Sequence, residues 1–186
     1  MKSLYTRKLQ ALVLVTFGLI LSGCALPGWM PGSTSDSGQA ISPGEKVTLH
    51  FFTKIPNFDT GVALQSGAHY QLKVQLLNNW IDSYIETNEL GEPLHETGFD
   101  NSQMPFEFLG FTRRSQSHNW FELMLMQPNC KSSSLQGISD LSFDEANNSY
   151  NFVAACDGNL TLFVNDAYGF YLNNVGYANL GLSRAN

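Results

Sequence analysis

The chain has 186 residues, a formal net charge of −6 and 14% charged residues. Its ten Lys and Arg residues are too few and too scattered for a nucleic-acid-binding surface, which requires clustered basic side chains. The length and the 43% hydrophobic content suit one globular domain with its own core.

The N-terminal segment has the features of an export signal. Basic residues within positions 1–8 precede an uncharged, mostly apolar run over 9–21, and Leu21-Ser22-Gly23-Cys24 closes the run with small residues and a cysteine. The apolar run is short for a membrane span, so residues 1–23 are predicted to be a signal peptide. Its ending resembles the lipobox of bacterial lipoproteins. An ordinary signal peptide with a chance cysteine is the alternative.

The lipobox resemblance implies that Cys24 is acylated and anchors the mature chain in a membrane, where each buried methylene contributes about 0.8 kcal/mol. In lipoproteins an Asp after this cysteine favours the inner membrane. Ala25 stands here instead and implies the outer membrane, on its periplasmic face or at the cell surface. Residues 24–45 are rich in Gly, Pro and Ser and are predicted to form the lipidated cysteine and a flexible linker, followed by one domain over 46–186.

From Lys46 onward the patterns are those of strands and turns, without a sustained helical period. Apolar and polar residues alternate over 47–51, 70–76 and 178–182, and denser apolar runs cover 120–126, 150–155 and 160–164. Short strands separated by Gly, Asn and Asp predict an all-β fold, a sandwich of two sheets. The weakly patterned segment 86–103 is expected to be a long loop, where functional residues often lie.

Two cysteines, Cys130 and Cys156, remain if Cys24 is lipidated. In an exported protein such a pair is predicted to form a disulfide, which would contribute roughly 3 kcal/mol under the chain-entropy model. Two free thiols are the alternative.

An oxygen-rich loop follows the apolar run 160–164. Asp166, Asn173 and Asn174 offer carboxylate and amide oxygens, and Gly169 permits a sharp turn between them. Ca²⁺ binds such mixtures of charged and neutral oxygen donors. Asn, Asp and Gly are also ordinary turn residues whose side chains can hydrogen-bond the backbone without a metal, and composition alone favours that alternative.

The run from Asn165 to Gly176 resembles the calcium loop of the PA-IL-like galactophilic lectins, where Asn-Asp, a short turn, Tyr and Asn-Asn-x-Gly hold a calcium that binds sugar hydroxyls. The resemblance implies a galactose-binding-like, jelly-roll sandwich. It also implies a set of calcium ligands, comprising the side chains of Asp166, Asn173 and Asn174 and the carbonyls of Phe170 and Ser83. Ser83 enters this set because it follows Trp80 by three residues, as in the family. The similarity begins near Thr60 and is sharp only in the last third of the chain.

The segment that contacts galactose in those lectins has no clear counterpart, and 86–103 occupies its place. His95 in that segment is either a sugar donor or a solvated loop histidine. A calcium ion that keeps two waters can exchange them for a vicinal diol, which makes Asp166, Asn173 and Asn174 predicted ligand-binding residues as well. A closed site would make the ion a structural staple instead.

These observations predict a lipid-anchored envelope protein with calcium-assisted, non-catalytic carbohydrate binding. One alternative is an assembly lipoprotein that uses the sandwich as a docking module. A second is a glycoside hydrolase that uses carboxylates of the polar loop, namely Glu86, Glu89, Glu92 and Glu96. The sequence predicts neither the sugar, the oligomeric state nor a partner protein.

Overall fold

The structure is a computed structural model that describes residues 38–186. The predicted signal peptide (1–23), the lipidation site Cys24 and the first part of the predicted linker lie outside the described residues. Within 38–186, no helix has the length and apolar character needed to cross a bilayer.

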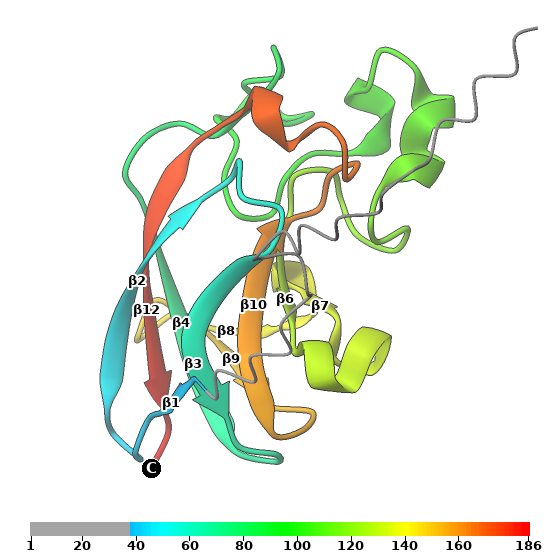
Figure 1. The fold of residues 1–186 in the computed structure, drawn as a ribbon. Coiled ribbons are helices and arrows are strands. Elements are labelled where there is room, and N and C mark those ends of the chain that lie inside the picture. Colours follow the sequence, from blue (N-terminus) through cyan, green and yellow to red (C-terminus); the bar gives the residue numbers. More distant parts are fainter. Residues whose placement is uncertain (1–37) are drawn as a thin grey trace, which may run out of the picture. The chain divides into compact units, whose positions relative to one another are not determined.

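The described chain is a two-sheet β-sandwich, which confirms the predicted fold class (Figure 1). The first sheet has the order β1 (Gln39–Ala40), β3 (Phe58–Leu64), β10 (Gly158–Val164), β6 (Leu123–Met126) and β7 (Gln136–Gly137). The second has the order β2 (Lys46–Phe52), β12 (Tyr177–Arg184), β4 (His69–Leu76), β9 (Ser149–Val153) and β8 (Ser142–Asp144). Neighbouring strands are antiparallel except β1 and β3, which are parallel.

Shorter elements lie in the connections. They are β5 (Ile81–Asp82), β11 (Asn174–Val175) and five 3₁₀ segments: η1 (Asn101–Gln103), η2 (Glu107–Thr112), η3 (Pro128–Ser134), η4 (Ile138–Asp140) and η5 (Tyr171–Asn173). The segment between β4 and β6 and the segment between β10 and β12 gather at one end of the sandwich (Figure 1).

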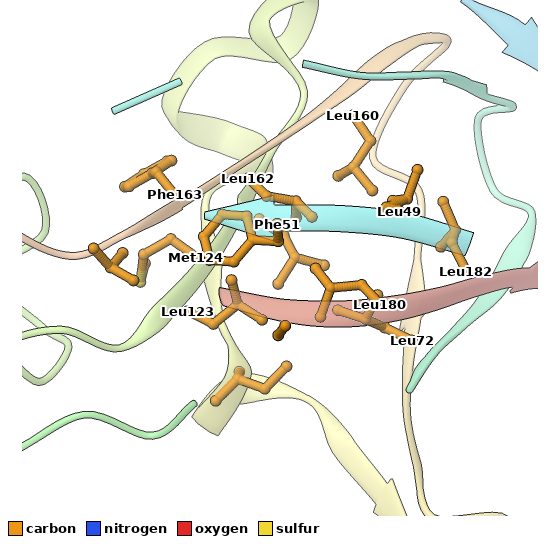
Figure 2. Packing of buried hydrophobic residues seen from close by; sticks show 14 of the residues in the cluster. Leu49, Phe51, Leu72, Leu123, Met124, Leu160, Leu162, Phe163, Leu180 and Leu182 are labelled. Carbon is orange, nitrogen blue, oxygen red and sulfur yellow. The ribbon is translucent and has the colours of Figure 1, made fainter. Parts of the chain in front are cut away.

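The core lies between the sheets because alternate residues of each strand point inward. Leu49 and Phe51 of β2 are buried while their neighbours are not, and Leu180 and Leu182 of β12 repeat the pattern. Figure 2 shows these side chains packed with Leu72, Leu162 and other apolar residues. The alternation read from the sequence therefore does mark the face of each strand that packs into the core.

The predicted runs differ from the observed strands mainly in the first sheet. The run 120–126 pairs as a strand only from Leu123, because Phe121 adopts a left-handed backbone with φ 61° and directs its N–H to the Asn165 carbonyl at 2.8 Å. Strand β3 was not among the predicted strands, because Asp59, Thr60 and Gly61 interrupt its apolar alternation.

The sandwich begins before residue 46. Strand β1 pairs with Val62 and Ala63 of β3, and Ile41 is buried in the core. Residues 39–41, placed in the linker by the sequence prediction, thus belong to the folded unit, because an edge strand needs only backbone pairing and one inward side chain.

The disulfide between Cys130 and Cys156 is confirmed, with Cα atoms 6.1 Å apart. It joins η3 to the turn between β9 and β10. Gln127 supports the same junction, since its Oε1 accepts the Ala155 N–H at 2.8 Å and its Nε2 donates to the Cys156 carbonyl.

Candidate cation site

The oxygen-rich loop meets a second loop through a two-residue pairing. Strand β11 pairs antiparallel with β5, and Asn174 stands opposite Asp82. Asp166 begins the same loop just after β10, and its Oδ2 accepts a hydrogen bond from Asn174 Nδ2 at 3.0 Å. Backbone pairing therefore brings together polar residues that are far apart in the sequence.

Both ends of the loop are fixed by residues without free polar groups. Asn165 is fully buried; its Oδ1 accepts the Ser115 N–H at 2.8 Å, and its Nδ2 donates to the carbonyls of Ser115, His118 and Asn119. At the other end Gly176 has φ 143°, and a Cβ there would lie 2.5 Å from Trp80 Cδ1. Asn165 and Gly176 hold the loop in place and leave Asp166 and Asn174 to define the site.

Asp166 and Asn174 are buried, with 2% and 4% of their surfaces exposed. Asp166 Oδ1 accepts the N–H of Ala167 at 2.6 Å. Asn174 Nδ2 also donates to the Thr53 carbonyl at 3.4 Å, but Asn174 Oδ1 has no hydrogen-bond partner. A buried oxygen without a donor is costly, so this oxygen is suited to a cation.

Asp82 adds a second buried carboxylate, with 6% of its surface exposed. Burial, and then the neighbouring charge of Asp166, raise the pKa of Asp82 to about 7. Burial also raises the pKa of Asp166, although hydrogen bonds from Asn174 and Ala167 oppose the shift. Among the described residues neither carboxylate forms an ion pair with a basic side chain. Two ionised carboxylates held together this way repel each other unless a cation lies between them.

The two carboxylates open into a recess of about 210 Å³. Its lining comprises Asp82, Ser83, Tyr84, Ile85, Met104, Pro105, Leu109, Thr112, Trp120, Asp166, Ala167, Phe170 and Asn173. Four of the five predicted metal ligands thus line one recess, and the fifth, Asn174, contacts Asp166. That these residues bind a metal stays a prediction.

The two predicted carbonyl ligands lie on tight turns. Ser83 has φ 57° within a turn closed by reciprocal backbone hydrogen bonds between Asp82 and Ile85, at 3.0 and 2.8 Å. The Phe170 carbonyl accepts the Asn173 N–H at 3.1 Å and keeps a second lone pair. Non-glycine residues with positive φ are uncommon and concentrate at functional sites.

Sequence reasoning missed Asp82. It lies in Asn79-Trp80-Ile81-Asp82-Ser83, directly before the predicted carbonyl ligand Ser83. An acidic residue beside a predicted ligand was the available signal, but its burial against Asp166 depends on the β5–β11 pairing. The described residues contain no cluster of three or more His, Cys, Asp or Glu suited to a metal. Two carboxylates with neutral oxygens form a donor set that favours a hard cation such as Ca²⁺ over zinc.

Residues proposed for other roles lie elsewhere. His95 does not line the recess; its Nδ1 is 3.2 Å from Thr97 Oγ1 and 3.8 Å from Glu96. Of the four loop glutamates, Glu86, Glu89 and Glu92 are exposed, and Glu96 accepts the Tyr150 hydroxyl at 2.8 Å. The recess lining contains none of these glutamates.

No family model and no curated protein matches the chain. Among solved structures it is similar to a domain described as "EclA N-terminal domain; PllA-like lectin". The identity is 18%, the match covers 74% of this chain and 94% of that chain, and the TM-score is 0.45. The sandwich architecture given above rests on the strand pairing and not on this similarity.

Proposed function

We propose that the protein binds Ca²⁺ at Asp82, Asp166 and Asn174 and, through this ion, the hydroxyls of a carbohydrate, without catalysing a reaction. The observation that carries the proposal is a pair of buried carboxylates without a basic partner, beside an unpaired amide oxygen, in a recess that opens to solvent.

The described residues fit the ion by charge and by donor type. Asp82 and Asp166 provide negative charge, and Asn174 Oδ1 has no competing donor. The carbonyls of Ser83 and Phe170 and the exposed side chain of Asn173 add neutral oxygens at the same recess. Two carboxylates also imply tighter binding than the single carboxylate expected from the sequence, because affinity follows ligand charge.

The sugar-binding step depends on the open side of the site. An ion exposed to the recess keeps water ligands that two neighbouring hydroxyls of a sugar can replace. The carboxylates would be occupied by the ion, and this leaves no described acid in the recess to protonate a glycosidic oxygen.

The decisive experiment compares melting temperatures in calcium and in chelator, using a mature chain with Cys24→Ser to prevent acylation. Calcium should raise the melting temperature by several degrees, because it binds the native state alone. Asp166→Asn should remove the shift, whereas the exposed control Glu107→Gln should keep it. Identical melting curves with and without calcium, together with no heat in a calcium titration, would overturn the proposal.

We also propose that acylated Cys24 anchors the domain in the outer membrane, on the basis of the lipobox-like sequence alone. Labelling of growing cells with a radioactive or clickable fatty acid should mark the wild-type protein and not Cys24→Ser. Recovery of an unlabelled wild-type protein from the soluble fraction would contradict the anchor.

A second candidate function has one observation in its favour. Segment η2 and its N-cap expose Phe106, Phe108 and Phe111 by 59%, 70% and 71%. Exposed aromatic clusters mark contact surfaces, so the sandwich is alternatively a docking module in which calcium is structural. Calcium-dependent melting combined with silence on a glycan array would favour this alternative.

A further inference from the structure

We propose that the preferred ligand is an amphipathic glycoside, a sugar that carries an aryl or alkyl substituent seated on the apolar wall beside the ion. The inference rests on the proposed function and specifies the ligand of the same site.

The recess has two chemically distinct parts. Asp82, Ser83, Asp166 and Asn173 gather the polar groups around the proposed ion. The remaining wall is predominantly apolar and comprises Tyr84, Ile85, Met104, Pro105, Leu109, Trp120, Ala167 and Phe170. A ligand that fills both parts must present hydroxyls at one end and an apolar group at the other.

The apolar wall comes from a segment with no sequence counterpart in the lectins that the loop resembles. Met104 lies between η1 and η2, and Leu109 lies within η2. Met104 and Ile85 pack on the core from one side and face the recess from the other. Trp120 is buried, and its Nε1 donates to Asn101 Oδ1 at 2.8 Å, so its polar group is already paired.

The wall is held by hydrogen bonds rather than left as a loose loop. Asn101 Nδ2 donates to the Glu107 carbonyl at 3.0 Å, which ties η1 to η2. Asp100 caps η1 by accepting the Ser102 N–H at 2.8 Å. A Cβ at Gly110 would lie 2.6 Å from Asn101 Oδ1, so these segments pack closely. A preformed wall lowers the cost of ordering on binding.

A bare sugar fits this wall poorly. Hydroxyls placed against Met104 and Leu109 would lose water without gaining a partner. An apolar substituent gains there instead, since each buried methylene is worth about fourfold in affinity.

The test uses the calcium-loaded protein and matched methyl, phenyl and octyl glycosides of galactose, glucose, mannose and fucose, titrated below the octyl compounds' micelle concentration. For the sugar that binds, the phenyl or octyl glycoside should bind at least about tenfold more tightly than the methyl glycoside. A preference for phenyl indicates an aromatic conjugate as the natural ligand, and a preference for octyl indicates a glycolipid.

Variants locate the gain. Leu109→Asn and Met104→Gln should abolish it and leave methyl glycoside binding and calcium-dependent melting unchanged. Phe108→Ser is the matched control, because Phe108 lies in η2 but does not line the recess. Its affinities should match wild type.

The outcomes separate this inference from the proposed function. Equal binding of methyl, phenyl and octyl glycosides overturns the inference and leaves calcium-assisted sugar binding intact. A gain that survives Leu109→Asn and Met104→Gln but disappears in Phe108→Ser also overturns it. Calcium binding without retention of any glycoside overturns both the carbohydrate function and the inference.

Discussion

Two buried polar regions lie close to the end of β10, and they treat their carboxylates in opposite ways. Glu122, 1% exposed, accepts the N–H of Asn119 at 3.0 Å and both the N–H and the hydroxyl of Ser139 at 2.9 and 2.6 Å. Asp82 and Asp166 are similarly buried, but they face each other without a basic partner among the described residues. The comparison teaches that burial of a carboxylate does not mark a site; burial without enough donors does.

The paired region also contains a chain of groups typical of hydrolases. Ser115 Oγ is 2.5 Å from His118 Nδ1, and His118 Nε2 is 2.7 Å from Asp140 Oδ2. Ser115 is buried, its N–H binds Asn165, and its hydroxyl is also 3.3 Å from Ser117 Oγ. We therefore interpret this chain as a brace for the 115–119 loop and not as a nucleophile with its base.

The largest expected effect lies in the paired region. Glu122→Ala leaves the Asn119 and Ser139 donors buried without an acceptor, and should lower the free energy of unfolding by about 3 kcal/mol. Chemical denaturation measures this loss, which should be the same with calcium and with chelator. A loss below 1 kcal/mol, on the order of one ordinary hydrogen bond, would mean that the region relaxes or admits water.

The unpaired region should respond with the opposite sign. Asp82→Asn removes one of two repelling carboxylates, so in chelator near neutral pH it should raise the free energy of unfolding by about 2 kcal/mol. In calcium the same variant should be less stable than wild type, because the ion loses a charged ligand. Denaturation in both conditions checks the reversal. Destabilisation in chelator would show that Asp82 has a favourable partner.

The pH dependence sharpens this contrast. The folded-state pKa of Asp82 is raised to about 7, so the unfolded chain releases its proton at lower pH than the folded one. The associated stability is present below the unfolded pKa, about 3.9, and is lost as pH rises through about 7. In chelator the melting temperature should therefore fall between roughly pH 5 and pH 8. Calcium should suppress the fall, and Asp82→Asn should reduce it.

Much of the fold could be predicted because its determinants are local. Alternation of apolar and polar residues located β2, β4 and β12, since a strand with one buried face must show it. Strand β3 escaped because Thr60 and Gly61 form a kink, where Gly61 has φ 66°. Its place in the sheet is set by pairing with β10, a long-range contact that local sequence does not encode.

The site divides in the same way. Asp166, Asn173 and Asn174 share one loop, so sequence resemblance was enough to group them with Ser83 and Phe170. Asp82 joined them only through the pairing of β5 with β11. The apolar wall around Met104 and Leu109 was likewise unpredictable, because 3₁₀ turns carry no sustained hydrophobic period.

The smallest effect returns to the paired region and tests whether its ion pair is a brace. Burial alone would raise the pKa of Asp140, but hydrogen bonds from His118 and the Gly137 N–H, with attraction to His118, lower it overall. Its stabilisation is therefore present above the unfolded pKa and is lost as pH falls through the lower folded value. Because the Asp140 side chain is half exposed, Asp140→Asn should cost at most about 1 kcal/mol near neutral pH. The difference from wild type should vanish in acid, whereas calcium-dependent melting should stay unchanged. A loss of the calcium shift in this variant would mean that the two regions are coupled through the Asn165 loop, and the contrast between a paired brace and an unpaired site would have to be given up.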